Sequence, residues 1–138
     1  MIIVKKVNWI DENYGEADIL LSDGTYSVNC FCSDCNFSEG DTFSGILYGF
    51  DVKNIVKSFN EGYAIDEKKD NYYIQGKVVD RKSEILQIGE FLIDLSDGNI
   101  PKDIKQSDYV EANISRIDIY WMIINWYFIV RLGINRKT

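Results

Sequence analysis

The chain is a succession of short runs rich in β-branched and aromatic residues, each closed by Asn, Asp, Gly or Ser. These runs read IIVKKVNWI, ADILL, TYSVNCFC and TFSGILYGF in the first half, then YYIQGKVVD, EILQI, EFLIDL and YVEANISRIDIYW in the second. Runs of this length and composition are typical of β-strands. No segment in the first 110 residues keeps a convincing helical period, although residues 53–59 are the best place for a short helix. The pattern predicts an all-β protein with more than six strands and little helix.

The spacing of the runs indicates how the strands are arranged. They recur at intervals of about ten residues, which is typical of an antiparallel barrel or sandwich. The strand-turn-strand spacing and the EGD sequence before an apolar strand are similar in pattern to small barrels of the OB or SH3-like type. We therefore expect an antiparallel barrel or sandwich of this kind.

The two halves of the chain resemble each other. EADILLSDG (16–24) is similar to GEFLIDLSDG (89–98), and residues 39–52 are similar to residues 106–119. The similarity predicts two related small half-barrels. They would be a first β repeat at 1–59, a junction at 60–71 and a second β repeat at 72–138. The alternatives are one compact domain over 1–138, and two β-meanders that merely share turn residues.

The most apolar run lies near the C-terminus. Residues 119–130 read IYWMIINWYFIV, and the run is closed by Asp118 before it and Arg131 after it. A membrane-spanning helix needs about 20 apolar residues, so this run is too short to be one. Its β-branched and aromatic content predicts a strand buried in the core or in a homo-oligomer interface.

Three cysteines stand close together in CFCSDC, at positions 30, 32 and 35, and the chain has no others. Strand alternation places Cys30 and Cys32 on one face as core residues, with Cys35 in the following turn. A zinc site needs four ligands, so Cys30, Cys32 and Cys35 are weak metal candidates. A redox pair of Cys32 and Cys35 is disfavoured by the neighbouring acids. We expect no cofactor and no metal.

The chain contains no histidine, which removes the commonest general base and the commonest metal ligand. It also lacks a Gly-rich phosphate loop, a nucleophile elbow and a calcium loop. These features predict a protein that is not an enzyme. The N-terminal sequence does not have the form of a signal peptide, and an odd number of cysteines is typical of a reducing compartment. We therefore expect a cytoplasmic location.

Charge is distributed unevenly along the chain. The net charge is −7, and residues 7–52 hold nine acids without a single Lys or Arg, whereas residues 53–138 hold 13 acids and 13 bases. Such a stretch either keeps the surface soluble or forms a face for a basic partner. Loops and turns carry most binding residues. The predicted partner-binding residues are therefore Asp11, Glu12, Asp34, Glu39 and Asp41.

These observations favour a non-catalytic, acidic protein-binding module. Its most specific version is an immunity or inhibitor protein that neutralises a basic toxin or nuclease by occluding its active site. An OB-like nucleic-acid- or ligand-binding module is the alternative, although nucleic acid needs basic clusters and only KKDNYYIQGK (68–77) interleaves bases with aromatics. A second alternative is an oligomeric scaffold that associates through the C-terminal apolar segment. We expect no membrane association, because anionic lipid repels an acidic protein.

Overall fold

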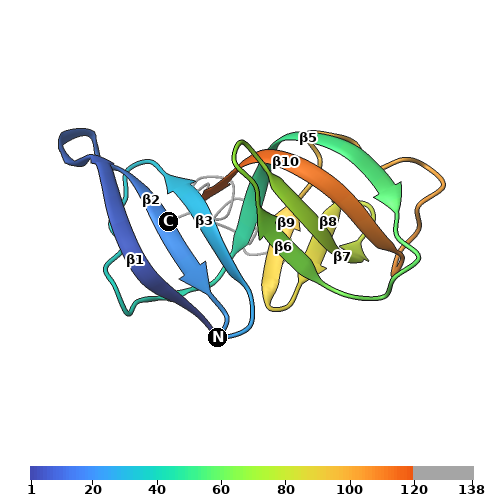
Figure 1. Cartoon of the computed structure of the whole chain (residues 1–138), viewed down its shortest axis with the longest axis horizontal. Helices are drawn as coiled ribbons and strands as arrows, with labels where there is room; N and C mark the ends of the chain where they lie inside the picture. Colours follow the sequence, from blue (N-terminus) through green and yellow to red (C-terminus); the bar gives the residue numbers. More distant parts are fainter. Residues whose placement is uncertain (120–138) are drawn as a thin grey trace, which may run out of the picture.

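The computed structural model describes residues 1–119, which form ten strands and one short 3-10 turn (Figure 1). The prediction of an all-β fold with little helix is confirmed, and the strands fall on the predicted runs except β6, which lies within the expected junction at 60–71. The predicted C-terminal strand lies outside the described residues from position 120 onwards. The elements are β1 (Ile2–Asp11), η1 (Glu12–Tyr14), β2 (Glu16–Ser22), β3 (Ser27–Cys32), β4 (Thr42–Phe43), β5 (Ile46–Lys57), β6 (Ala64–Glu67), β7 (Tyr72–Asp80), β8 (Ile85–Ile88), β9 (Phe91–Asp94) and β10 (Tyr109–Ile119).

Five of the strands close into a small barrel, which confirms the barrel prediction. β7, β8 and β9 form an antiparallel meander, and β10 returns to pair with β7. β5 completes the ring, because it pairs antiparallel with β10 and parallel with β9. β6 extends the meander as a hairpin with β7. β5 lies within the first expected repeat, so strands from both halves of the chain build one barrel.

The first three strands form an antiparallel sheet that lies beside the barrel, as Figure 1 shows. The short strand β4 covers the outer edge of β1 at Ile2 and Ile3. The sheet joins the barrel where β3 pairs with β10 in parallel, with Phe31 opposite Asp118 and Cys32 opposite Ile119. β10 is therefore the strand that connects the sheet to the barrel.

The two LSDG segments of the sequence occupy different places in the fold, one in the first sheet and the other in the barrel. LSDG at 21–24 runs from the end of β2 into the turn that leads to the neighbouring strand β3. LSDG at 95–98 follows β9, and the Asp97 side chain accepts hydrogen bonds from the backbone N–H groups of Asp51 and Val52. The same four letters therefore make a local hairpin in one half and a long-range contact in the other.

The short helix expected at residues 53–59 is wrong. β5 continues through this stretch to Lys57 and pairs along it with β10, with Val56 opposite Glu111. Asn54 adopts a left-handed backbone with a φ of 58°, which a helix would not contain. Cross-strand pairing therefore overrides the weak local preference of this segment.

One hydrophobic core runs through both parts of the molecule. Alternate residues of β2 and β3 point into it, including Ala17, Ile19 and Leu21, and they meet barrel residues there. Because a strand directs every second side chain to the same face, this alternation explains why each run in the sequence mixes apolar and polar residues. The largest fully buried side chains are Phe91, Ile19, Leu21, Leu47, Ile74, Leu86, Ile88, Ile93, Leu95, Ile104, Ile114 and Ile117.

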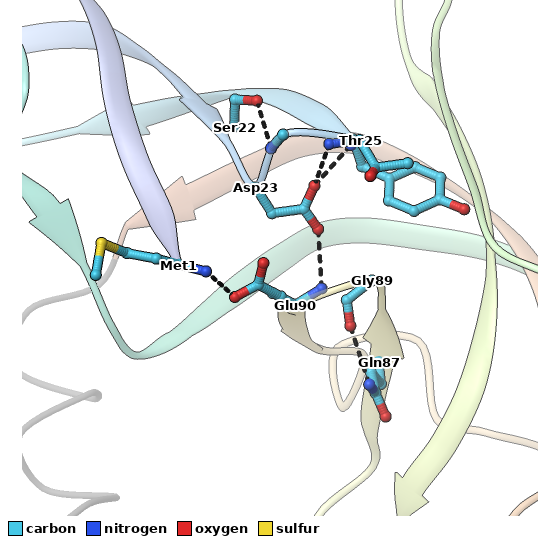
Figure 2. Close-up of polar contacts among 9 residues, drawn as sticks. Met1, Ser22, Asp23, Thr25, Gln87, Gly89 and Glu90 are labelled. Atoms are coloured by element: carbon cyan, nitrogen blue, oxygen red, sulfur yellow. Dashed lines mark hydrogen bonds and ion pairs between the residues drawn. The ribbon is translucent and has the colours of Figure 1, made fainter.

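A carboxylate clamps the sheet to the barrel at the turn between β2 and β3 (Figure 2). One oxygen of Asp23 accepts from the backbone N–H groups of Thr25 at 2.8 Å and Tyr26 at 2.7 Å. Its other oxygen accepts from the backbone N–H of Glu90 at 2.9 Å, in the turn between β8 and β9. The side chain of Glu90 in turn forms an ion pair with the N-terminal ammonium of Met1. The clamp fixes how the first sheet sits against the barrel.

Candidate functional site

The connection between β1 and β2 is a tight acidic turn at one end of the sheet (Figure 1). Asp11 caps the turn η1, because its side chain accepts from the backbone N–H groups of Asn13 at 3.2 Å and Tyr14 at 3.4 Å. Gly15 ends η1 in the left-handed conformation with a φ of 70°, where glycine carries no steric penalty. An Asp before the turn and a Gly after it therefore determine its shape.

The loop after β3 brings a further carboxylate, that of Asp34, to this turn. The N–H of Cys35 donates to the carbonyl oxygen of Gly15 at 2.8 Å. A Cβ placed on Gly15 would lie 3.3 Å from the Cα of Asp34, so the two backbones are in close contact. Asp11, Glu12 and Asp34 therefore lie together, with Glu16 paired opposite Asp11. Within residues 1–119, none of these four carboxylates belongs to an ion pair.

Large apolar side chains are exposed at the same place. Trp9 is 44% exposed, Ile10 is 57% exposed and Tyr14 is 76% exposed. Aromatic residues of this kind are enriched among the anchors of protein interfaces. We call residues 9–16 together with Asp34 the acidic tip, because it combines four carboxylates with three exposed apolar side chains.

The other two predicted acids lie elsewhere. The Asp41 side chain accepts from the N–H of Ser38 at 2.8 Å, and its carbonyl accepts from the N–H of Val4 at 2.8 Å. Glu39 is exposed in the same turn. Val4 and Asp11 are seven residues apart on β1, which corresponds to roughly 20 Å along a strand. The structure therefore brings Asp11, Glu12 and Asp34 together, and it places Glu39 and Asp41 near the other end of β1.

The cysteines occupy the positions that strand alternation predicts. Cys30 and Cys32 are fully buried in the core, and Cys35 is half-buried in the loop that follows. Burial, followed by the nearby Asp118 carboxylate, raises the pKa of the Cys30 thiol. Among residues 1–119, no three Cys, Asp or Glu side chains are grouped so that they could hold a metal ion. Cys30 and Cys32 therefore act as core residues in this fold.

A polar groove of about 440 Å³ separates the outer face of the first sheet from the β6–β7 hairpin. The guanidinium of Arg116 lies on its floor, 4.9 Å from the ring centroid of Phe31 and 5.1 Å from that of Phe50. Asp118 accepts two hydrogen bonds from this guanidinium, at 2.7 and 2.9 Å. Sequence reasoning missed this arrangement. Its residues come from strands far apart in the chain, and their spacing gives no local signal.

The rim of the groove carries both signs of charge. Asp18 and Glu67 approach from opposite sides, and burial together with the Glu67 charge raises the pKa of Asp18. The Tyr72 hydroxyl donates at 2.9 Å to Glu67 and lies 2.9 Å from the carbonyl oxygen of Asn29. Lys68 and Lys69 line the same groove at the tip of the hairpin. The groove is therefore mixed in charge, unlike the acidic tip.

The comparisons with known proteins found no relative. The chain matches no protein-family model, no curated protein and no solved structure. None of the helical segments within residues 1–119 is long and apolar enough to cross a membrane. The acidic tip and the groove are therefore the two places in the described structure from which a function can be proposed.

Proposed function

We propose that the protein is a non-catalytic binding module that recognises a basic protein through its acidic tip. The supporting observation is that Asp11, Glu12 and Asp34 lie at the same end of the first sheet as the exposed Trp9 and Tyr14. Exposed aromatic anchors supply affinity, and a field of one sign increases the rate of association with an oppositely charged partner. In its most specific form, the partner is a basic toxin or nuclease whose active site the tip occludes.

The test begins with the reading frame next to the gene for this chain, which the immunity version expects to encode a large secreted protein with a small basic C-terminal domain; that domain is then the toxin used in the assay. Co-expression with the protein should restore growth of cells that the toxin domain kills, and the purified pair should associate quickly at low salt and slowly at high salt. A neighbouring frame that encodes a replication or translation protein would contradict the immunity version of this function.

Three matched pairs of charge-neutralising changes locate the binding surface. The first removes two tip carboxylates, the second removes the two acids beside Val4, and the third is a control in the near-neutral part of the chain. We expect the first pair to slow association most and the control to leave it unchanged. Equal effects from all three would show that the acidic stretch only solubilises the protein. The pairs are Glu12→Gln with Asp34→Asn, Glu39→Gln with Asp41→Asn, and Glu61→Gln with Asp66→Asn.

A second candidate function is ligand or nucleic-acid binding in the groove. Three basic side chains and two aromatic rings line this groove together, and this favours such a function. The linear sequence did not show this grouping of Lys68, Lys69, Arg116, Phe31 and Tyr72. Equal numbers of acids line the groove, however, so it would repel a phosphate backbone about as much as attract it. Titration with a single-stranded oligonucleotide near physiological salt separates the two functions, because only the groove function predicts binding.

A further inference from the structure

The outer edge of β1 is open over most of its length. β4 pairs with it only at Ile2 and Ile3, and the turn containing Gly40 and Asp41 bonds only to Val4. From Lys5 to Ile10, no strand among residues 1–119 lies on this edge. All side chains over this stretch are exposed except that of Val7, which is half-buried.

An open edge of this kind presents backbone N–H and C=O groups to which another strand can add. The exposed Trp9 and Ile10 lie along it and would lose water-exposed apolar surface on pairing. The charges along this edge determine which kind of strand can pair with it. Lys5 and Lys6 stand at one end, and Asp11 and Glu12 stand at the other.

The charges on this edge complement those of a second copy of the same edge that runs in the antiparallel direction. Two copies of β1 centred on Asn8 would bring Lys5 of each close to Asp11 of the other, with the irregularities of β1 at Lys5 and Ile10 lying at the two ends of the paired stretch. The favourable pair would therefore form twice. Val7 would lie opposite Trp9. These two residues share the face directed at the core, because their neighbours on β2 are the fully buried Ile19 and Ala17. A parallel arrangement would instead place lysines against lysines and acids against acids.

An extended basic segment of another protein matches only half of this edge, because Lys5 and Lys6 would repel it. A second copy of the chain matches both ends. We propose that β1 pairs with β1 of a second copy across a two-fold axis, which joins the two first sheets into one continuous sheet. This proposal does not depend on the proposed function. Because Asp11 and Glu12 belong to both surfaces, a basic partner and the second copy would compete for them.

The test uses sedimentation over a concentration series to compare the self-association of the unsubstituted protein, of two variants and of an equimolar mixture of these variants. The first variant carries Lys5→Glu and Lys6→Glu, and the second carries Asp11→Lys and Glu12→Lys. Each variant alone would place like charges opposite each other, so we expect its dimer dissociation constant to rise by roughly tenfold or more. An equimolar mixture of the two variants should form a heterodimer, because opposite charges then face each other at both ends of the edge.

The mixture also controls for lost stability, because Asp11 caps η1 and its replacement removes that cap. Hydrogen exchange supplies a second measurement, in which backbone amides of residues 5–11 should exchange more slowly at concentrations that favour the dimer. A chain that stays monomeric at every concentration would overturn the proposal and identify Lys5 and Lys6 as residues that protect the edge. A dimer that is insensitive to both variants would also overturn it and would assign association to another surface, such as residues 120–138.

Discussion

The side chain of Asp23 accepts a hydrogen bond of 2.9 Å from the backbone N–H of Glu90, across 67 residues of sequence. It thereby joins the turn of the first sheet to a turn of the barrel. Gly89, with a φ of 57°, makes this approach feasible, because a Cβ there would collide with the Asp23 carboxylate and the ring of Tyr26. The orientation of the acidic tip relative to the barrel therefore depends on this contact.

We predict that Asp23→Asn lowers the free energy of unfolding by about 1–2 kcal/mol at neutral pH, because the amide cannot satisfy the N–H donors as a carboxylate does. Burial alone would raise the pKa of Asp23, but the N–H donors of Tyr26, Glu90 and Thr25 together bring that pKa below 3.8. A lowered folded-state pKa stabilises the fold above pH 3.8, and this stabilisation disappears as the pH falls through the folded pKa.

Urea unfolding between pH 2 and 7 measures this effect, and the Asp23→Asn variant should show a shallower loss of stability in acid. The control is Asp103→Asn, since Asp103 is exposed in the loop between β9 and β10. If both variants follow the same curve as the unsubstituted protein, the clamp contributes nothing to stability.

Gly76 lies where β10, β7 and β8 meet, and it is the position at which added volume should cost most. A Cβ there would overlap the carbonyl oxygen of Gln87 and would lie 2.8 Å from the Cγ1 of Ile88. Gly76→Ala should therefore lower the unfolding free energy by about 3 kcal/mol, measured by chemical denaturation. Gly62→Ala is the control, because its Cβ would meet only the Nε2 of Gln75 at 3.7 Å. Equal stability of the two variants would contradict this packing.

Arg116 is predicted to stabilise the junction between sheet and barrel through Asp118, whose side chain is only 6% exposed. Arg116→Ala removes two hydrogen bonds from a buried carboxylate and should cost about 2 kcal/mol of unfolding free energy. The exposed pair of Lys53 with Asp51 provides the comparison, since Lys53→Ala should cost less than about 1 kcal/mol. In a protein that already carries Asp118→Asn, Arg116→Ala should lower the unfolding free energy by clearly less than it does in the unsubstituted protein. If that cost stays the same, the pair is not coupled.

Much of the fold could be predicted from the sequence, because strand signals are local. Alternation in EADILLSDG and the turn residues that follow it are sufficient to predict the hairpin of β2 and β3. The partners of β5 and β10 could not be predicted in the same way. Whether β5 pairs with its neighbours in the first repeat or closes a barrel with β9 and β10 depends on contacts between distant strands, which leave no periodic signal.

The candidate site was predicted in part. The base-free stretch pointed to the acids, and the preference of binding residues for turns and loops selected Asp11, Glu12 and Asp34 among them. The separation of Asp41 from Asp34 depends on the path of a loop that crosses from β3 to β4, and sequence spacing does not determine that path. The groove around Arg116 was missed because its residues are contributed by five separate segments.

The last prediction concerns the three thiols. Cys35 is half-buried, whereas Cys30 and Cys32 are fully buried, and burial raises the pKa of the Cys30 thiol. Because the thiolate is the reactive species, a disulfide reagent such as Ellman's reagent should label one thiol in the native protein and all three after unfolding. Cys35→Ser should abolish the native-state labelling, and Cys30→Ser should leave it unchanged. Three thiols that react together at one rate in the native protein would contradict the placement of Cys30 and Cys32 in the core, and would reopen the question of a metal or redox site in CFCSDC.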